Sequence, residues 1–440
     1  GREAPVFVAH GDDVEIYRAV FEDLNAKGKL SKDGVAYDPY STLEVEGEVL
    51  ALLRDGESLS AAVVGDSVEV VLPKTCFYVE SGGQVSDMGT IASAGSPHWE
   101  IQVEDIRRPA AGILVHMGRV VKGEPRVGET AIARVDAARR RDTIRNHTAT
   151  HLLHAELHAV LRGHARQAGS LVAPDKLRFD FTHSEAVTPE QLEKIEAGVN
   201  RAILENYRLK IETKPQAKAI EEGAMALFGE KYGDMVRTIA IGGGDPFSYE
   251  LCGGTHVEET GDIGLFLIVS ESSAAAGVRR IEAVTGRAAY ELVQRRFRAL
   301  KRAANLLNGT PEDVPVKIEL LQDELADQHK RMMHLRQEAA ASEFVRLLDG
   351  VPEVKGVPVM AVTLANADAD TLRQMTDRFR QRYASGVVVV GSAVEGRPVL
   401  IAAVTDDLIK RGLHAGDLLK TIAKKIDGSG GGRPNLAQAG

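Results

Sequence analysis

The sequence has few cysteines and no long apolar run, and each shortage excludes a class of protein. Its 440 residues include two cysteines, Cys76 and Cys252, which is too few for a disulfide framework. No run of about 18 apolar residues occurs, so a membrane span is disfavoured. Residues 1–10 have neither a basic leader nor an apolar core, which disfavours a secretory signal. We therefore expect a cytoplasmic protein that does not associate with membranes.

Composition and charge indicate a soluble chain with several domains. Hydrophobic residues make up 44% of the sequence and charged residues 27%, and at roughly 100–200 residues per domain we expect two to four units. The formal net charge of −9 argues against a surface that coats nucleic acid without specificity. Residues 351–440 differ from this average, because their 12 Lys and Arg against 9 Asp and Glu give a local +3. That segment is the better candidate for contact with a polyanion.

The hydrophobic periodicity predicts an α+β, multidomain fold. Short alternating runs punctuated by Gly and Pro are typical of a small β-barrel or sandwich, and we expect the barrel. Steps of three and four from residue 288 predict a pair of helices that pack as an antiparallel hairpin. The predicted segments are a lead-in at 1–40 with a short helix near residues 14–24, a β-barrel at 41–135, an α+β domain at 136–287, a helical hairpin spacer at 288–350 and a small α/β domain at 351–440.

Histidines gather on one predicted helix, and a second His/Cys motif follows about a hundred residues later. His147, His151, His154 and His158 keep to one helix face because their spacings are four, three and four. Cys252 and His256 flank a turn-forming Gly-Gly-Thr. One thiolate with two or three imidazoles is a zinc donor set. The spacing does not decide between the pair 147/151 and the pair 154/158.

Two familiar catalytic patterns are missing. The residues between His147 and His151 are Thr-Ala-Thr, so the HExxH signature of zinc proteases is not present. The glycine-rich run at 428–434 lacks the Lys-Ser/Thr of a triphosphate-binding loop and follows a predicted helix, so nucleotide triphosphate binding is not supported.

Several strings in order resemble the alanyl-tRNA synthetase family over about residues 40–440. They are ESGGQ at 80–84, RNHTATHLLH at 145–154, QAGS at 167–170, LRFDF at 177–181, AMALFGEKYG at 224–233, ELCGGTH at 250–256, RRIEA at 279–283 and GGGRPNLAQ at 430–438. The first seven are similar to the editing region of that family and the last to its C-terminal domain. Residues 1–40 resemble no motif of its ATP-dependent aminoacylation domain.

The resemblance implies hydrolysis of seryl- or glycyl-tRNA(Ala) that was charged by mistake. An alanine pocket rejects glycine and serine poorly, so a second, hydrolytic site is needed. The resemblance implies one zinc ion per chain, with His147, His151, Cys252 and His256 as the metal residues; His256 is either a direct ligand or an outer partner. Gln167 is expected to position the substrate, and Thr148 or Thr150 to accept the seryl hydroxyl.

Contacts with tRNA(Ala) are expected at five positions and within the C-terminal domain. Arg279, Arg280 and Arg433 supply positive charge, while Gly82 and Gly83 form a turn that suits either close approach of another chain or an ordinary sheet corner. The resemblance also implies a homodimer through the C-terminal domain.

The resemblance leaves several hypotheses open. We expect the C-terminal half of a synthetase, since the chain starts without Met and residues 437–440 stop where the family continues. The alternatives are a freestanding alanyl-tRNA editing protein, a non-catalytic tRNA-binding module with a structural zinc, and a zinc hydrolase that acts on an unrelated ester or amide.

Overall fold

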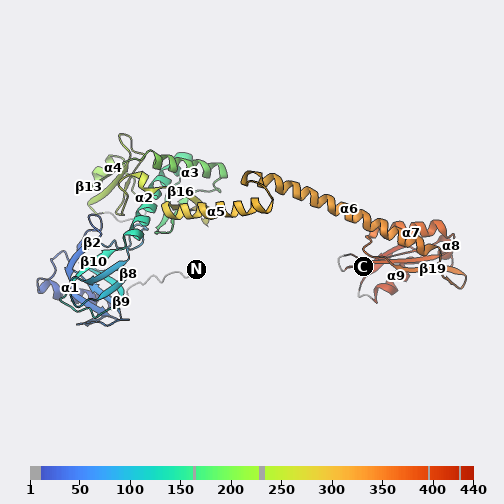
Figure 1. Ribbon diagram of the computed structural model, residues 1–440, viewed down its shortest axis with the longest axis horizontal. Helices are drawn as coiled ribbons and strands as arrows, with labels where there is room; N and C mark the ends of the chain where they lie inside the picture. The colour runs from blue at the N-terminus through green and yellow to red at the C-terminus, as the bar shows by residue number, and fades with distance from the viewer. Residues whose placement is uncertain (1–10, 162–164, 227–232, 395–396, 426–427) are drawn as a thin grey trace. The chain divides into compact units, whose positions relative to one another are not determined.

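The computed structural model describes residues 11–161, 165–226, 233–394, 397–425 and 428–440 (Figure 1). Part of the predicted lead-in and part of the string at 224–233 lie outside these ranges. The chain divides into two compact units, Gly1–Arg298 and Ala299–Gly440. The first unit contains several sheets and the second contains a sheet of six strands, and both contain helices, which confirms the α+β, multidomain prediction.

The first unit begins with helix α1, Gly11–Ala26, where a short helix was predicted. An antiparallel sheet of eight strands follows, and its alternating pattern buries one face, with Val68, Val70 and Ile101 in the core. In spatial order the strands are β2 (Glu44–Glu48), β10 (Thr130–Val135), β7 (Gly89–Ser93), β8 (Glu100–Ala110), β9 (Ile113–Lys122), β5 (Ser67–Val71), β3 (Ala51–Arg54) and β4 (Glu57–Leu59).

The prediction of a β-barrel is wrong in one respect, because the described strands form no closed barrel. Residues 44–48 pair with β10, whereas residues 51–54 of the same stretch pair with β5. Between them, the amides of Val49 and Leu50 bond to the carbonyls of Glu129 and Val71, outside either ladder. The stretch therefore changes partner at this point, and strands β2 and β4 stand at the two ends of the sheet.

The rest of the first unit packs two smaller sheets and helix α3, Pro189–Leu204, around helix α2, Ala137–Leu161 (Figure 1). Helix α2 is buried along most of its length, because Leu152, Leu153 and Leu157 enter the hydrophobic core while its histidines face polar partners. One sheet has the order β11 (Gln167–Val172), β12 (Leu177–Thr182), β17 (Val278–Thr285), β16 (Phe266–Ala275), and the other has the order β13 (Leu209–Pro215), β14 (Met235–Ile241), β15 (Ser248–Leu251).

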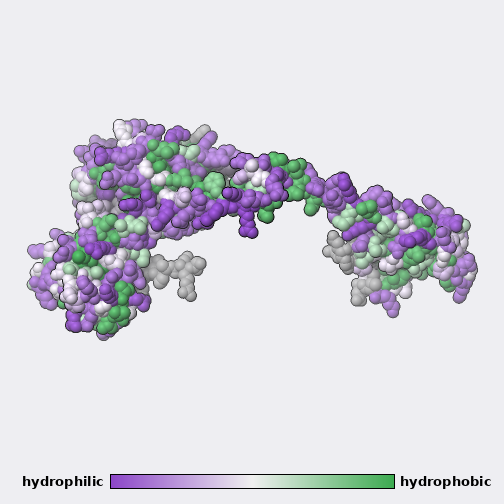
Figure 2. Space-filling view, viewed as in Figure 1, coloured by the Kyte–Doolittle hydropathy of each residue, from purple (hydrophilic) through white to green (hydrophobic). Residues whose placement is uncertain are grey.

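The predicted pair of helices after residue 288 is present as α5, Gly286–Leu306, and α6, Val314–Leu348. Many apolar side chains of α6 reach the surface, and Leu325 and Leu335 are 75% and 63% exposed (Figure 2). The antiparallel hairpin packing of the two helices stays a prediction. None of the helices in the described ranges is both long and apolar enough to span a bilayer.

The second unit ends in a mixed sheet of six strands. One hydrophobic core lies between the sheet and helices α6 and α7, Ala369–Arg382, and a second lies where helix α9, Ala415–Ala423, packs against the sheet. The strand order is β18 (Glu353–Val354), β19 (Val357–Thr363), β20 (Val387–Val394), β21 (Arg397–Val404), β23 (Leu436–Ala439) and β22 (Gly430–Gly432). Only β19 and β20 run parallel, with α7 as their connection.

Candidate metal centre

Helix α2 and the loop after strand β15 bring together, in the first unit, four side chains of the types that can hold a metal ion. His147 and His151 lie one turn apart on α2, and their rings stack with centroids 5.5 Å apart. The Sγ atom of Cys252 lies 3.3 Å from Nε2 of His147 and 3.4 Å from Nε2 of His256. One donor atom from each of these four residues lies within 4.8 Å of every other. The four residues can therefore share one ion.

The structure separates the two histidine pairs that spacing alone left equivalent. His154 and His158 are outside the group of four, and Nδ1 of His154 instead lies 3.1 Å from the carboxylate of Glu250. His158 stacks edge-on against His154, with ring centroids 4.6 Å apart. The helical pair in the group is therefore 147 and 151.

Each imidazole of the group is held through its Nδ1 atom by a different acceptor. The Oε1 atom of Gln84 accepts a bond of 2.6 Å from His147, and Oε2 of Glu250 accepts one of 2.8 Å from His151. Thr148 donates its own hydroxyl hydrogen to the carbonyl of Ile144, so its oxygen accepts from Nδ1 of His256, 3.1 Å away. All three rings therefore carry their proton on Nδ1, and Nε2 is left for the centre of the group.

The orientation of the Gln84 amide follows from its other partner. The backbone amide of Thr255 donates to Oε1 of Gln84 over 3.0 Å, and Nε2 of Gln84 donates to the Thr255 hydroxyl over 2.8 Å. A backbone N–H can only donate, so the oxygen must face Thr255 and His147. Gln84 thus connects the eight-stranded sheet to both halves of the metal group.

The donor set and its protonation fit a zinc ion. Nε2 of His151 is buried and has no hydrogen-bond partner among the described residues. Burial alone would raise the pKa of the Cys252 thiol, but the facing histidines hold it well below its ordinary value, which favours the thiolate. Burial lowers the pKa of His256 to about 3, which keeps it neutral. A thiolate with neutral imidazoles is the form that binds zinc.

In contrast to His256, His151 is protonated and charged when no metal is bound. Burial disfavours its charged form, but the Glu250 carboxylate outweighs that effect and raises the pKa of His151 to about 10. A metal must therefore displace this proton before it can bind to Nε2.

The loop that carries Cys252 is fixed by two side chains from other segments. The hydroxyl of Tyr40 donates to the carbonyl of Gly253 over 2.6 Å, and Nη1 of Arg237 donates to the carbonyl of Gly254 over 2.6 Å. The Arg237 guanidinium also lies over the Tyr40 ring, 4.2 Å from its centroid. Gly254 packs against the ring of His147 so closely that a Cβ atom there would collide with it.

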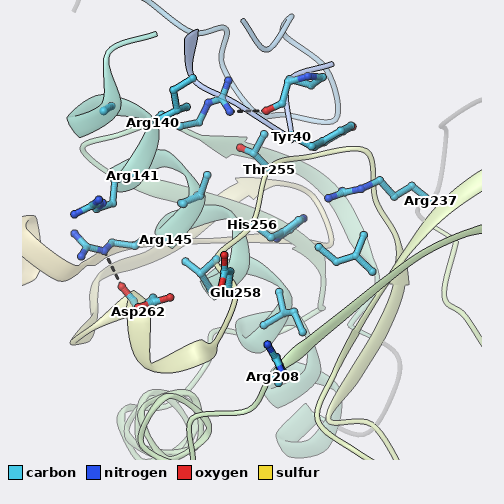
Figure 3. A pocket seen from close by; sticks show the side chains of 17 residues that line it. Tyr40, Arg140, Arg141, Arg145, Arg208, Arg237, Thr255, His256, Glu258 and Asp262 are labelled. Atoms are coloured by element: carbon cyan, nitrogen blue, oxygen red, sulfur yellow. Dashed lines mark hydrogen bonds between the residues drawn. The ribbon is translucent and has the colours of Figure 1, made fainter. Parts of the chain in front are cut away.

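A cavity of about 1000 Å³ opens beside the metal group, and arginines surround it (Figure 3). His256 and Thr255 form part of its wall, so one metal residue faces this space. Nε of Arg145 donates to the carbonyl of Asp262, whereas no ion pair involves Arg141 or Arg208 within the described part of the chain. The five arginines that line the cavity are Arg140, Arg141, Arg145, Arg208 and Arg237.

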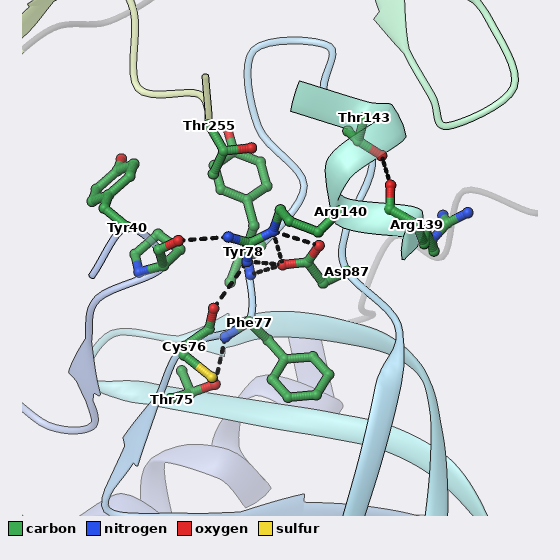
Figure 4. Close-up of polar contacts among 12 residues, drawn as sticks. Tyr40, Thr75, Cys76, Phe77, Tyr78, Asp87, Arg139, Arg140, Thr143 and Thr255 are labelled. Atoms are coloured by element: carbon green, nitrogen blue, oxygen red, sulfur yellow. Dashed lines mark hydrogen bonds and ion pairs between the residues drawn. The ribbon is translucent and has the colours of Figure 1, made fainter. Parts of the chain in front are cut away.

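Arg140 joins the start of α2 to the sheet through a buried ion pair (Figure 4). Its guanidinium bonds to both carboxylate oxygens of Asp87, and it also donates to the carbonyls of Pro39 and Cys76 over 2.6 and 3.0 Å. The Asp87 carboxylate in turn accepts from the amide of Tyr78 over 2.7 Å. This network fixes helix α2, which carries His147, relative to the turn that carries Gln84.

The substrate-positioning residues predicted from the sequence have local partners. Thr148 and Thr150 are buried and donate to the carbonyls of Ile144 and Asn146, one helical turn back. Gln167 is half-buried on β11 and donates to the Ser170 hydroxyl over 3.1 Å. Among the described residues, no hydrogen bond joins Gln167 to the metal group. Their roles toward a substrate stay predictions.

The predicted RNA contacts also have partners within the protein. Arg279 bonds to both carboxylate oxygens of Glu271 on the neighbouring strand. Arg280 bonds in the same way to Asp180. These contacts neutralise both guanidinium groups, and contact with RNA stays a prediction for them.

The glycine turn and the C-terminal arginine lie in different units. Gly83 has φ +81°, and its backbone lies so close to Ser170 of β11 that a side chain would collide. The close approach that its glycines suggested is therefore made to the same chain, and Gly82 precedes it in that turn with φ +59°. Arg433 follows β22 in the second unit and is exposed.

Sequence reasoning missed four residues that support the centre, namely Gln84, Glu250, Tyr40 and Arg237. Gln84 and Glu250 stand inside strings that the sequence analysis used only for the resemblance. An acidic residue two positions before the cysteine of a His/Cys motif was the available signal for Glu250. The second cysteine, Cys76, lies in the sheet core, and burial raises the pKa of its thiol to about 11.

Three family models match separate parts of the chain. Residues 15–139 match "tRNA synthetases class II (A)", residues 236–282 match "Threonyl and Alanyl tRNA synthetase second additional domain", and residues 356–440 match "DHHA1 domain". The first match begins inside the lead-in segment, residues 1–40, in which the sequence analysis recognised no motif of the family.

Similar proteins extend the match to nearly the whole chain. The alanine–tRNA ligase of Pelotomaculum thermopropionicum is 46% identical over 91% of this chain and 45% of its own length. That of Desulforamulus reducens is 42% identical over 97% of this chain and 50% of its own length. The solved C-Ala domain of Aquifex aeolicus alanyl-tRNA synthetase is 25% identical, with a TM-score of 0.19 over 20% of this chain and 79% of that domain.

The chain thus spans about half the length of the curated relatives it matches. Their identity, together with the editing-type and C-terminal family models, shows that the chain belongs to the alanyl-tRNA synthetase family.

Proposed function

We propose that this chain hydrolyses seryl- or glycyl-tRNA(Ala) in the cytoplasm, with one zinc ion held by His147, His151, Cys252 and His256. The observation that carries the proposal is the position of the metal group on the wall of an arginine-lined cavity. The family supplies the tRNA partner, and the model of the second additional domain covers the Cys252 loop. The ligase activity named for the relatives would belong to a full-length protein of their kind. Dimerisation through residues 351–440 stays a prediction.

A zinc ion at this position would supply a Lewis acid next to the cavity, which can polarise an ester carbonyl or a water molecule. The protein's own contribution is positional. Gln84 and Thr148 fix the directions of His147 and His256, while Tyr40 and Arg237 hold the loop between Cys252 and His256. These contacts keep the group in place without requiring movement of the backbone.

The cavity arginines would bind the phosphates at the acceptor end of the tRNA. Arg141 and Arg208 are exposed, and neither forms an ion pair within the described ranges, so their charges are available to a polyanion. Such contacts give affinity that falls steeply with salt. We expect Arg208→Ala to weaken tRNA binding. The number of phosphate contacts, obtained from the slope of log affinity against log salt concentration, should fall by about one. Arg18→Ala is the matched control, since Arg18 is exposed, far along the chain and paired with Glu15.

Deacylation of seryl-tRNA(Ala) against alanyl-tRNA(Ala), with and without a chelator, tests the proposal. We expect selective hydrolysis of the seryl ester that chelation abolishes and that Cys252→Ala removes. Cys76→Ala is the control, because Cys76 is the other buried cysteine and lies in the sheet core. Equal hydrolysis by the Cys252 variant and the control would contradict the proposal.

The donor set also favours a second candidate, a tRNA-binding module with a structural zinc. Four protein donors complete a tetrahedral site, which is typical of structural zinc, whereas catalytic sites keep one position open. Under this alternative the protein binds tRNA but does not hydrolyse its ester. Loss of hydrolysis in Cys252→Ala with unchanged folding and tRNA affinity would exclude it.

A further inference from the structure

Glu250 is a buried carboxylate at the back of the metal group, on strand β15 and two residues before Cys252. It is 3% exposed, and each of its oxygens accepts from a histidine of α2. Oε2 lies 2.8 Å from Nδ1 of His151, and Oε1 lies 3.1 Å from Nδ1 of His154. The hydroxyl of Ser248 also donates to Oε1, over 3.1 Å. A carboxylate in such a place needs hydrogen-bond donors, and these three groups supply them.

We propose that Glu250 is a positioning residue for the metal group, which holds Nδ1 of His151 and thereby directs Nε2 toward Cys252. This proposal shares with the proposed function the binding of a metal by the four residues, and it does not depend on hydrolysis of tRNA. Glu250 is not itself in the group of four, so its effect reaches the metal through His151.

The geometry sets His151 apart from the other two imidazoles. Nε2 of His151 is buried and makes no hydrogen bond in the described part of the chain, so the bond to Glu250 is the hydrogen bond that orients this ring. His147 is also fixed by its contact with Cys252. The acceptors of His147 and His256 are a neutral amide and a neutral hydroxyl, whereas that of His151 is a carboxylate. A charged acceptor both fixes the tautomer and makes the imidazole a stronger donor to the metal.

His154 competes for the same carboxylate but does not replace His151. Its ring packs against Phe179, with centroids 5.1 Å apart, and its Nε2 atom lacks a partner among the described residues. His154 therefore satisfies the second oxygen of Glu250 in the apolar core. Because His154 bonds to Oε1, Glu250 can accept from His151 through Oε2 without leaving either carboxylate oxygen without a hydrogen-bond donor.

The test is the zinc affinity of the full chain, measured by competition with a chromophoric chelator. Glu250→Met removes the acceptor for His151, and we expect the zinc dissociation constant to rise about 100-fold. Glu250→Gln keeps an acceptor oxygen for His151 but removes the charge, and we expect the zinc dissociation constant to rise about 10-fold. Ser248→Ala is the matched control, because it removes a donor to Glu250 and touches neither histidine. We expect less than a threefold change for it.

Cobalt substitution adds a spectroscopic measurement that a purely structural role would leave unchanged. In Glu250→Gln the d–d bands are expected to shift while the thiolate charge-transfer band of Cys252 persists. Wild-type zinc affinity in Glu250→Gln, or a wild type that binds no zinc, would overturn the proposal. If the affinities follow the predicted order but seryl-tRNA is not hydrolysed, the positioning role holds and the deacylase function fails.

Discussion

The buried pair between Arg140 and Asp87 gives the sharpest prediction about stability. Arg140 is 5% exposed and Asp87 is 3% exposed, so neither charge has water as an alternative partner. Arg140→Met removes the cation and leaves the Asp87 carboxylate with the amide of Tyr78 as its remaining donor in the network. Breaking a buried pair from one side costs about 3–5 kcal/mol, because the second charge stays buried without compensation.

The loss is large enough to measure by thermal or urea denaturation. For a unit of this size, about 3–5 kcal/mol corresponds to a fall in Tm of roughly 5–8 °C. Arg287→Ala is the control, because Arg287 pairs with Asp142 on the surface and is 63% exposed. Exposed pairs contribute about 0–1 kcal/mol. The reasoning is refuted if Arg140→Met and Arg287→Ala lower the free energy of unfolding equally.

A double variant separates the charge effect from the lost hydrogen bonds. Asp87→Asn combined with Arg140→Met removes both charges, so it should recover part of the loss. The recovery should stay incomplete, because the carbonyls of Pro39 and Cys76 still lack the donors that Arg140 supplied. A double variant less stable than Arg140→Met would show that an unpaired Asp87 charge is not the cause.

Three further variants test other parts of the account. Gly254→Ala should reduce zinc affinity at least 10-fold while Gly253→Ala does not, because only the first places a Cβ against His147; equal affinities would contradict this. Gln84→Leu should raise the zinc dissociation constant about 10-fold in chelator competition, and an unchanged constant would show that the amide does not orient His147. Burial lowers the pKa of His116 to about 4, so as the pH falls the unfolded chain binds a proton on this histidine before the folded chain does. The free energy of unfolding should therefore fall by up to about 3 kcal/mol between pH 6.5 and pH 4, and by less in His116→Gln.

The resemblance implied the four residues of the metal group, but nothing in the sequence analysis indicated the side chains that hold them. Histidine spacing on a helix and the Cys-Gly-Gly-Thr-His string each depend on local geometry, which a sequence displays directly. The contact between Gln84 and His147 joins residues 63 positions apart, and it exists because Arg140 fixes α2 on the sheet. Such support depends on tertiary packing, which periodicity does not encode.

Other differences between prediction and structure have similar causes. The spacing could not choose between the pair 147/151 and the pair 154/158, since all four histidines lie on the same helix face. The positions of Glu250 and Cys252, far along the chain, distinguish the two pairs. Alternation predicted the strands of the sheet, but the change of partner at residues 49–50 is a property of pairing. The first family model also reaches back to residue 15, where no motif was recognised.

The most direct test of the central claim follows zinc occupancy and seryl-tRNA(Ala) hydrolysis in the same samples. Metal-free chain is titrated with zinc, and the bound metal and the deacylation rate are measured at each step. The account predicts a rate that rises in proportion to bound zinc and reaches its plateau at about one ion per chain, as a single group of four donors requires. A rate that does not change with zinc occupancy would contradict it.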